Sequence, residues 1–144
     1  KEHIYTMIVK DYHSRPVVVR ENSSVYDAIC AMFLEDVGTL IVSDENSFLS
    51  GIISRKDLLK AAMGNQDLKT IPVSVVMTRM PNIITCEAED TLYQAASQMI
   101  RHQIDALPVV RKVDEENRKY EIIGRITKTT IVKAFVELGE NISV

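Results

Sequence analysis

The sequence predicts an α+β fold built from two tandem copies of one β-α-β-β-α unit. Residues 25–33 return as residues 92–100, which lie 67 positions later, and residues 51–61 return as residues 124–134, which lie 73 positions later. The six extra positions fall in the polar stretch 112–120, where a hairpin tip tolerates added residues. We therefore expect two similar halves packed with pseudo-twofold symmetry, and a crevice between them of the kind that binds small ligands.

Local chemistry predicts the first strand and the first helix. Residues 15–19 form a short β-branched run, and Pro16 biases the preceding backbone toward extended conformations. Ser23 or Ser24 can cap the helix that follows. The apolar positions 25, 28, 29, 32 and 33 have the spacing of a single helical stripe, so we expect all five to face a core.

The remainder of the first copy reads strand, strand, helix. Residues 39–42 are almost wholly apolar, as in a strand covered on both faces. Residues 48–53 form the next strand after a polar turn at 44–47. Ser54 begins a helix that ends near Gly64.

The second copy repeats this order after a polar connector. The expected elements are strands at 83–85, 106–110 and 122–126, a helix from Leu92 capped by Asp90 or Thr91, and a closing helix at 128–136 with Gly139 beyond it. The boundaries that we expect are residues 4–64 for the first repeat and 73–137 for the second. Each half alone has a small core, so we expect the halves to pack together as one unit.

Composition and charge exclude several classes of protein. The net charge is −3, and 46% hydrophobic with 26% charged residues is ordinary for a globular protein. Lysine and arginine are scattered along the chain, so these residues do not predict nucleic-acid binding by themselves. No apolar run approaches the roughly 20 residues of a membrane helix, and no signal peptide opens the chain. We expect a cytoplasmic protein with no membrane partner.

The chain lacks the residue patterns of a metal site or an active site. Cys30 and Cys86 show no CxxC pattern and lie beside apolar segments, so we interpret both as buried, inert thiols in a reducing cytosol. The three histidines have no metal-ligand spacing. No nucleophile with a base, no catalytic carboxylate pair and no phosphate-binding glycine loop is recognisable, so we do not expect an enzyme.

Three motifs identify a family by their order and duplication. They are Met-Thr-Arg at 77–79, Ile-Asp-Ala-Leu-Pro-Val-Val at 104–110, and a Gly-h-h-Ser-x-x-Asp pattern at 51–57. Over about residues 4–136 the chain resembles a pair of cystathionine-β-synthase (CBS) domains, a regulatory module. The resemblance implies an adenine nucleotide (AMP, ADP or ATP) or another adenosine derivative as the ligand, and association through helices into a homodimer.

A second set of segments carries a closer resemblance. These segments are 36–40, 54–59, 77–82 and 124–129. They are similar to the C-terminal half of catabolite repressors of gluconeogenic genes in Gram-positive bacteria, which carry an N-terminal helix-turn-helix domain before the CBS pair. The printed chain opens at Lys1 without methionine or such a domain. We therefore expect a fragment whose DNA contacts lie in residues outside it.

The resemblance implies a nucleotide site around Asp57. A carboxylate at this position can accept charge-assisted hydrogen bonds from both ribose hydroxyls. Ser54 lies where a helix begins and where free N–H groups attract anions, and Ser14 matches the family's hydroxyl in the segment before the first strand. Apolar backbone would contact the base, and basic residues would meet phosphate. The full predicted set is Ser14, Pro16, Val18, Val37, Thr39, Ser54, Asp57, Arg55, Arg125 and Lys128.

Local sequence leaves another interpretation of Ser54 and Asp57 open. Ser-x-x-Asp at a helix start is also a variant of the capping box, in which both side chains satisfy backbone donors only. Capping and ligand binding can coexist.

The second copy departs from the family pattern at the position of the carboxylate. Thr127 keeps the hydroxyl, but Thr130 stands where the acid would be. The lost interaction is worth on the order of 1.5–3 kcal/mol, or roughly tenfold to a hundredfold in affinity, so we expect a weaker site or a different ligand. Its predicted walls are Thr78, Ile84, Asp105, Ala106, Thr127 and Thr130. Asp105 would repel phosphate if it faced the cleft, and the alternative is that it is exposed.

The sequence leaves two functions open. In the first, nucleotide binding shifts the population of two arrangements of the CBS pair, and an attached domain responds. In the second, the pair is a dimerisation scaffold with a vestigial cleft, and the helix faces that contain Met32, Phe33, Met99 and Ile100 would associate. Core packing explains those faces equally well, and Asp57 favours sensing.

Overall fold

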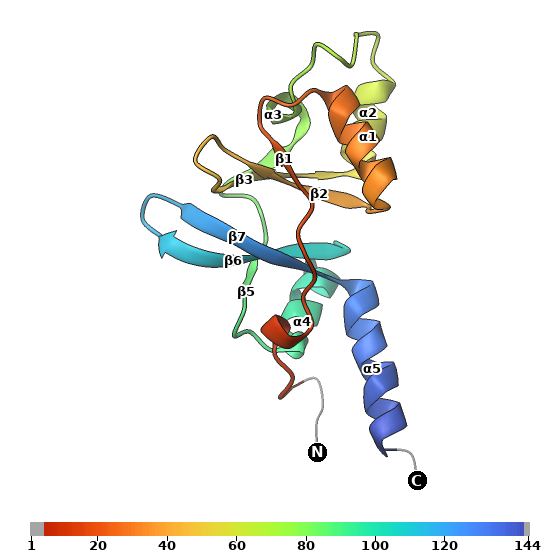
Figure 1. Cartoon of the computed structure of the whole chain (residues 1–144), viewed down its shortest axis with the longest axis vertical. Helices are drawn as coiled ribbons and strands as arrows, with labels where there is room; N and C mark the ends of the chain where they lie inside the picture. The colour runs from red at the N-terminus through yellow and green to blue at the C-terminus, as the bar shows by residue number, and fades with distance from the viewer. Residues whose placement is uncertain (1–4, 143–144) are drawn as a thin grey trace. The chain divides into compact units, whose positions relative to one another are not determined.

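The computed structural model describes residues 5–142, with side chains described up to Glu137. Residue 4, the expected start of the first repeat, lies outside the described residues. The chain divides into two compact units. The first-repeat unit contains Pro16–Ile83 and Lys112–Glu121, and the second-repeat unit contains Lys1–Arg15, Ile84–Arg111 and Ile122–Val144. The predicted α+β class is confirmed, with one small sheet assigned to each repeat (Figure 1).

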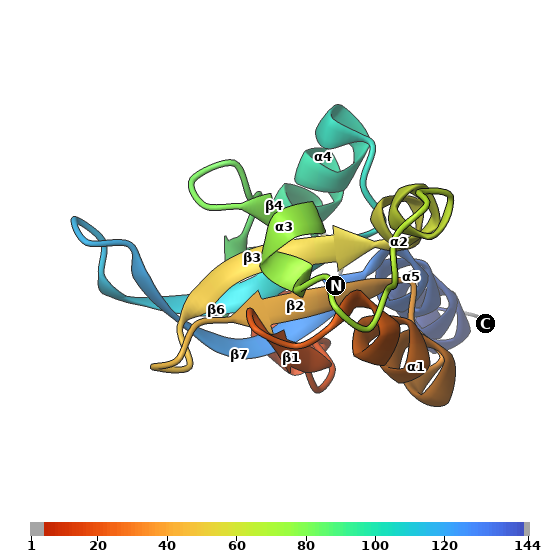
Figure 2. The same cartoon turned by 90° about the horizontal axis from the view of Figure 1, so that it is seen from above.

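The first-repeat unit contains a four-stranded sheet in the order β1-β2-β3-β4. Its strands are β1 (Val18–Arg20), β2 (Thr39–Ser43), β3 (Leu49–Ser54) and β4 (Thr78–Arg79). The first pair is parallel and the other pairs are antiparallel, and Figure 2 shows β1, β2 and β3 side by side. The helices are α1 (Val25–Glu35), α2 (Arg55–Ala62) and the short α3 (Val73–Val76). The order β-α-β-β-α expected for residues 15–64 is confirmed.

The core of this unit lies between one face of the sheet and the two longer helices. Helix α1 buries Val25, Ala28 and Met32 against β2 and β3, and Ser24 is its N-cap. The expectation that the whole stripe faces the core is wrong for Phe33, whose side chain is 82% exposed. Helical periodicity predicts which residues share a stripe, but the neighbouring elements decide how wide a part of it is covered.

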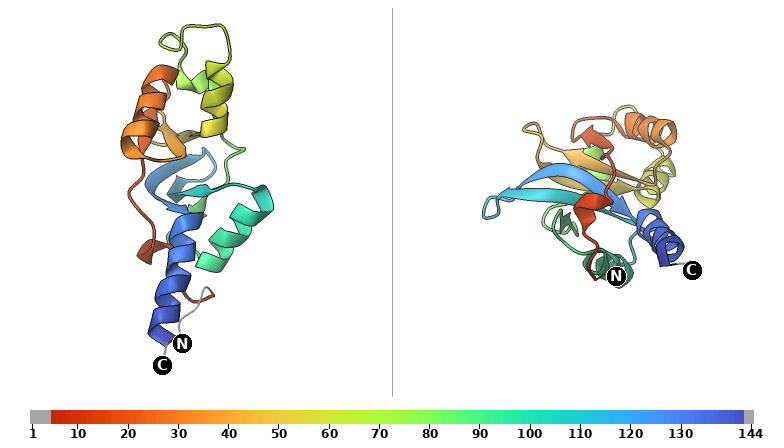
Figure 3. Two further views of the ribbon diagram at one scale, coloured as in Figure 1. Left: turned by 90° about the vertical axis from the view of Figure 1, so that its right-hand side faces the viewer. Right: turned by 60° about the horizontal axis from the view of Figure 1, so that its bottom comes forward.

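The sheet β5-β6-β7 belongs to the second-repeat unit except for its hairpin tip, residues 112–121. Its strands are β5 (Cys86–Glu87), β6 (Ala106–Asp114) and β7 (Lys119–Thr127), and its helices are α4 (Leu92–His102) and α5 (Lys128–Ile142), after the 3-10 turn η1 (Val9–Asp11). Helices α4 and α5 contact each other, as Figure 3 shows. The core contains Leu92, Met99, Leu107, Val109 and Ile126.

Two sequence-based boundaries in this unit are wrong. The strand expected at 83–85 begins at Cys86, because Cys86 and Glu87 are the residues that pair with Val109 and Val110 of β6. The closing helix continues through Gly139 to Ile142, since a glycine ends a helix readily only in the left-handed conformation, and no described glycine has a positive φ. Ile100 is 74% exposed, so core packing, one of the two explanations left open for its helix face, does not apply to this residue.

The inserted residues lengthen the β6–β7 hairpin. Both strands are longer than expected, and their connecting turn lies within the predicted stretch 112–120. At the turn, Asp114 accepts hydrogen bonds from the backbone N–H and the side-chain amide of Asn117 (3.2 and 2.8 Å). The side-chain bond, followed by the backbone bond, lowers the pKa of the Asp114 carboxyl. The hairpin tip belongs to the first-repeat unit, where Glu121 bridges to Phe48.

Candidate functional site

The start of α2 is organised by a reciprocal pair of side chains. Ser54 is the N-cap, and its Oγ accepts a hydrogen bond from the backbone N–H of Asp57 (3.3 Å). Oδ2 of Asp57 accepts hydrogen bonds from the backbone N–H and from the hydroxyl of Ser54 (2.9 and 3.1 Å). The capping interpretation of this motif is therefore realised in the structure.

Capping occupies only one of the two carboxylate oxygens. In the part of the chain that the structure describes, Oδ1 of Asp57 has no hydrogen-bond partner. Asp57 is half-buried, and the hydrogen bonds that its Oδ2 accepts also fix the position of Oδ1. The hydroxyl proton of Ser54 points to Oδ2 of Asp57, which makes Ser54 a positioning residue rather than a free donor.

Several hydroxyl side chains share the sheet face next to this cap. Ser54 pairs with Thr39 across β2 and β3, and Thr78 of β4 pairs with Ile52, two residues before Ser54. Paired residues and residues at i and i+2 project from the same face of a sheet. Thr39, Ser54 and Thr78 therefore line one face, opposite the face from which Ile53 enters the core.

The other residues expected around the first site differ in accessibility. Val18 is 42% exposed and Pro16 is half-buried, whereas the side chain of Val37 is in the core of the first-repeat unit, with 4% exposed. A contact between Val37 and a ligand would have to use its backbone. The guanidinium of Arg55 lies over Gly38, since a Cβ at Gly38 would be 2.9 Å from Nη1 of Arg55.

The equivalent helix start in the second-repeat unit is built from threonines. The backbone N–H of Thr130 donates to Oγ1 of Thr127 (3.1 Å), and the two hydroxyl oxygens lie 3.0 Å apart. Thr127 thus caps α5 as Ser54 caps α2, without a carboxylate. Next to this cap, Nζ of Lys128 forms an ion pair with Oδ1 of Asp105 (3.1 Å), and the Asp105 side chain is 86% exposed. Of the two alternatives for Asp105, the structure shows the exposed one.

The segment that precedes each repeat pairs with a strand of the other repeat. Ser14 forms two backbone hydrogen bonds with Arg125 of β7 (2.9 and 3.0 Å), so it belongs to the second-repeat unit. Thr78 pairs with β3 and belongs to the first-repeat unit. Neither partner could be found from local patterns, because strand pairing joins residues that are distant in sequence.

This exchange divides the predicted residues differently from their two expected sites. The first-repeat unit holds Pro16, Val18, Val37, Thr39, Ser54, Arg55, Asp57 and Thr78. The second-repeat unit holds Ser14, Ile84, Asp105, Ala106, Arg125, Thr127, Lys128 and Thr130.

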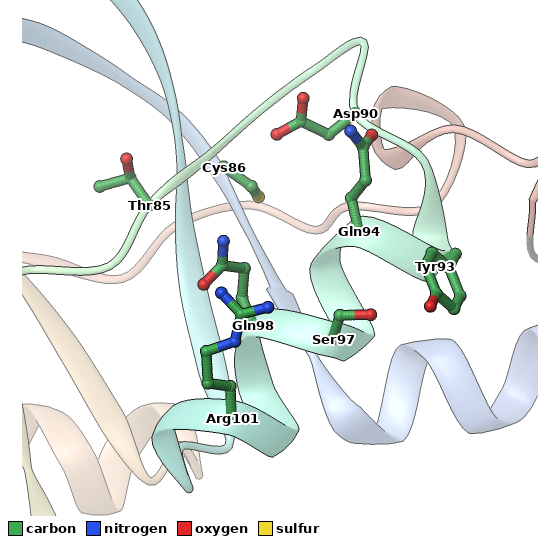
Figure 4. A pocket seen from close by; sticks show the side chains of 8 residues that line it. All are labelled: Thr85, Cys86, Asp90, Tyr93, Gln94, Ser97, Gln98 and Arg101. Carbon is green, nitrogen blue, oxygen red and sulfur yellow. The ribbon is translucent and has the colours of Figure 1, made fainter.

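A pocket of about 290 Å³ lies outside both predicted sites, between the start of β5 and helix α4. Its lining residues are Thr85, Cys86, Asp90, Tyr93, Gln94, Ser97, Gln98 and Arg101 (Figure 4). Burial, with smaller contributions from the negative charges of Asp90 and Glu87, raises the pKa of the Cys86 thiol to about 12. This thiol is buried and protonated, as expected of an inert cysteine, whereas Cys30 is only half-buried.

Residues 5–142 show no arrangement of metal ligands and no candidate membrane span. No group of three or more His, Cys, Asp or Glu side chains in this range is arranged to hold a metal ion. No helix in the same range has the length and apolar character needed to cross a bilayer.

Comparison with known proteins places this geometry in a family. The CBS domain matches twice, at residues 9–64 and 73–137. The transcriptional repressor CcpN of Bacillus subtilis is 55% identical over 133 residues, which are 92% of this chain and 61% of CcpN. Homoserine O-acetyltransferase of Methanocorpusculum labreanum is 35% identical over 87% of this chain and 23% of that protein. The chain thus spans about three-fifths of CcpN and a smaller part of the other relative.

Solved structures agree with the family match. The CBS domain pair of protein MJ0100, in complex with 5′-methylthioadenosine and S-adenosyl-L-methionine, gives a TM-score of 0.78 at 26% identity and covers 92% of this chain and 98% of that one. CBSX2 in complex with AMP gives a TM-score of 0.73 at 26% identity, with the same coverage. With two matches to the family in tandem and this likeness to solved pairs, the chain belongs to the CBS domain family.

Proposed function

We propose that the chain is a regulatory module that binds an adenine nucleotide, with Asp57 as the carboxylate that holds the ribose. The observation that carries the proposal is the state of this side chain, in which Oδ2 is engaged in capping and Oδ1 is left without a partner. A carboxylate oxygen can accept two hydrogen bonds, which matches the two hydroxyls of a ribose.

The surroundings of Asp57 support a nucleoside as the ligand. Thr39, Ser54 and Thr78 offer hydroxyl groups on one face of the sheet, and Val18 offers an exposed apolar surface beside them. Arg55 follows Ser54 directly and carries a positive charge to the same helix start. MJ0100 and CBSX2 were solved with adenosine compounds, which supports the same class of ligand here.

The identity to CcpN supports a place for this module in a transcriptional repressor. In this proposal the DNA-binding part lies in residues outside the chain, and the nucleotide shifts the module between two arrangements to which that part responds. The protein would then act on bacterial DNA in the cytoplasm. No catalytic step is assigned to the module.

A titration of adenosine, AMP, ADP and ATP against the purified chain tests the proposal. At 100 times the dissociation constant, the nucleotide is expected to stabilise the fold by about 2.7 kcal/mol, which is a rise of several degrees in melting temperature. Asp57→Asn should remove most of this rise, because it removes the charge while keeping an oxygen for the cap. The matched control is Asp27→Asn, since Asp27 occupies the same position after the Ser24 cap of α1.

Two outcomes would contradict the proposal. One is a wild-type chain whose melting temperature is the same with and without each compound. The other is a ligand response in Asp57→Asn that equals the response of wild type and of Asp27→Asn.

A second role, association of two copies, is favoured by exposed apolar side chains at matching positions of the two repeats. Phe33 and Ile100 are 82% and 74% exposed, and Leu59 and Val132 are 62% and 60% exposed. Met63 and Val136 are another pair of exposed apolar residues at matching positions. Because both helix pairs keep the same apolar positions uncovered, we propose that these faces form a homodimer. Sedimentation of wild type against Phe33→Glu and Ile100→Glu tests this role, and equal masses for all three would contradict it.

A further inference from the structure

The pocket between β5 and α4 is separate from the residues assigned to nucleotide binding. Its lining residues lie within 85–101, in the second-repeat unit, whereas Asp57 belongs to the first-repeat unit. No residue predicted for either nucleotide site lines it. Its volume of about 290 Å³ lies at the lower end of the range for small-molecule sites, so the pocket suits a compact metabolite.

A stripe of polar residues on α4 forms one wall of this pocket. The stripe consists of Gln94, Ser97, Gln98 and Arg101. These residues lie at i, i+3, i+4 and i+7, which places them on one side of the helix. At the equivalent positions of α1, 67 residues earlier, the first repeat has Asp27, Cys30, Ala31 and Leu34. The polar stripe is therefore specific to the second repeat and is not needed to build the repeated unit.

Most polar side chains in the pocket are available to a ligand. Those of Thr85, Ser97, Gln98 and Arg101 form no hydrogen bond or ion pair with any residue that the structure describes. None of their polar atoms is among the buried ones, so a molecule from solvent can reach them. Oε1 of Gln94 accepts a hydrogen bond from the backbone N–H of Thr91 (2.8 Å), which leaves the amide NH₂ of Gln94 as a donor.

The two ends of the pocket carry opposite charges. At one end, Oδ2 of Asp90 accepts a hydrogen bond from the backbone N–H of Glu87 (2.9 Å), and Oδ1 has no partner among the described residues. At the other end is the guanidinium of Arg101. Figure 4 shows the Asp90 carboxylate near Gln94 and the Arg101 guanidinium near Gln98, with the thiol of Cys86 between the two groups.

The floor of the pocket is neutral. Burial raises the pKa of the Cys86 thiol to about 12, and the negative charges of Asp90 and Glu87 add to this effect. The thiol is therefore protonated at neutral pH and presents a weakly polar, polarisable surface. Such a surface suits the methylene groups of a ligand better than a further charge.

The length of α4 separates the two charged ends. Arg101 lies nine residues after Leu92, the first residue of α4, so their Cα atoms are about 14 Å apart along the helix axis. Side chains on a helix lean toward its N-terminus, which shortens the gap between the guanidinium and Asp90 without closing it. An α-amino acid carries its ammonium and carboxylate on one carbon, so it is too short to contact both ends with these two groups.

We propose that this pocket binds a small zwitterion whose ammonium and carboxylate are separated by a chain of methylene groups. The ammonium contacts Oδ1 of Asp90, the carboxylate contacts Arg101 and Gln98, and the methylene groups lie over Cys86. This site goes beyond the proposed nucleotide function, because it gives the second-repeat unit a ligand of a different chemical class.

A titration with ω-amino acids of increasing length tests the proposal. The probes are glycine, 4-aminobutyrate and 6-aminohexanoate, added to the isotope-labelled chain while NMR follows the backbone amides of α4 and β5. Affinity is expected to rise from glycine to 6-aminohexanoate. Hexanoate and hexylamine keep one charged end each, so each should bind about tenfold more weakly than 6-aminohexanoate.

Variants at the two ends test the orientation of the ligand. Arg101→Gln should lower the affinity for 6-aminohexanoate and hexanoate about tenfold and leave hexylamine unchanged. Asp90→Asn keeps an oxygen for the Glu87 N–H and should weaken 6-aminohexanoate and hexylamine, but not hexanoate. Arg101→Lys should retain part of the affinity. The charge-matched controls outside the pocket are Lys133→Gln and Glu89→Gln, which should bind all probes as wild type does.

Three results would overturn the proposal. The first is the absence of concentration-dependent shifts in α4 and β5 with every probe. The second is equal affinity for 6-aminohexanoate in wild type, Arg101→Gln and Asp90→Asn. The third is hexanoate binding as tight as that of 6-aminohexanoate, which would make the ligand a simple carboxylate. Because Asp57 does not line this pocket, Asp57→Asn should bind 6-aminohexanoate normally, and loss of its nucleotide response would bear on the proposed function alone.

Discussion

The helix starts of α2 and α5 solve the same problem with different chemistry. Ser54 and Asp57 form a reciprocal cap that includes a carboxylate, and Thr127 and Thr130 form a cap from two hydroxyls. Both caps satisfy backbone donors in the first turn, so folding alone does not require the acid. Both repeats therefore need a capped helix start, but only the first has a carboxylate there, a group suited to a sugar diol.

The strand before each cap also differs in charge between the two repeats. Ile52 precedes the acidic cap by two residues, and Arg125 precedes the neutral cap by two residues. The two repeats thus share this backbone arrangement, with a negative charge on the helix in the first repeat and a positive charge on the strand in the second. Substitutions that make one repeat resemble the other can test each part of this comparison.

At neutral pH, the largest expected loss of stability comes from replacing the glycine before each of these positions. A Cβ at Gly124 would be 2.2 Å from Cδ2 of His13, and a Cβ at Gly51 would be 2.2 Å from Sδ of Met77. Methionine adapts more easily than an imidazole ring, so Gly124→Ala is expected to cost about 2–3 kcal/mol and Gly51→Ala about 1–2 kcal/mol. Urea unfolding of the two variants measures the difference, and equal losses would remove this asymmetry between the repeats.

Alkaline pH should affect the second-repeat unit through Cys86. Burial and the neighbouring acids raise its folded pKa from 9.0 to about 12, so the unfolded state loses this proton first as pH rises. The contribution of the protonated Cys86 thiol to the free energy of unfolding is fully present below pH 9. It falls by up to about 1.4 kcal/mol per pH unit between 9 and 12. Cys86→Val copies Val19 of the first repeat and should flatten this part of the stability–pH curve. If the slope of the stability–pH curve is unchanged in Cys86→Val, other titratable groups cause it.

The Asp57 carboxylate should stabilise the start of α2 more than the Thr130 hydroxyl stabilises the start of α5. Asp57→Ala is expected to cost about 1 kcal/mol, since it removes two hydrogen bonds to Ser54. Thr130→Ala should cost about 0.5 kcal/mol, because its backbone N–H still reaches Thr127. Thermal unfolding of both ligand-free variants provides the measurement. A larger loss for Thr130→Ala would mean that the hydroxyl pair is the stronger cap.

The smallest expected effect is the gain from restoring an acid in the second repeat. Thr130→Asp should stabilise the ligand-free chain by a few tenths of a kcal/mol, through a reciprocal cap and a favourable charge in the first turn of α5. If the proposed role of Asp57 is right, the same variant should also bind more adenosine per chain. Calorimetric stoichiometry checks this, and an unchanged value would show that a carboxylate at this position is insufficient.

The features predicted well from sequence are those that depend on neighbours along the chain. Ser24, Ser54 and Thr91 cap helices as expected, because each bonds to the residue three positions later. The hairpin around the inserted residues and the β-α-β-β-α order follow from similarly local patterns. The sequence allows both a capping role and a ligand-binding role for Asp57; the structure shows the capping contacts, and the ligand-binding role stays a prediction.

The features that sequence did not predict depend on distant partners. The bounds of β5 follow from its pairing with β6, and the exposure of Phe33 and Ile100 follows from which elements cover each helix. The pairing of Ser14 with Arg125 joins residues from the two ends of the chain. The burial of the Arg125 Nε was equally invisible, since the sequence indicated only a basic residue near the predicted site.

The exchanged pairing of Ser14 and Thr78 has a mechanical consequence. A protease cut in the connector between α2 and α3 would leave two fragments that still share a strand partnership, because residues before Pro16 pair with β7. For the same reason, tension applied to the backbone ahead of Tyr5 would load the second repeat before it reached β1, although the first repeat comes next in the sequence.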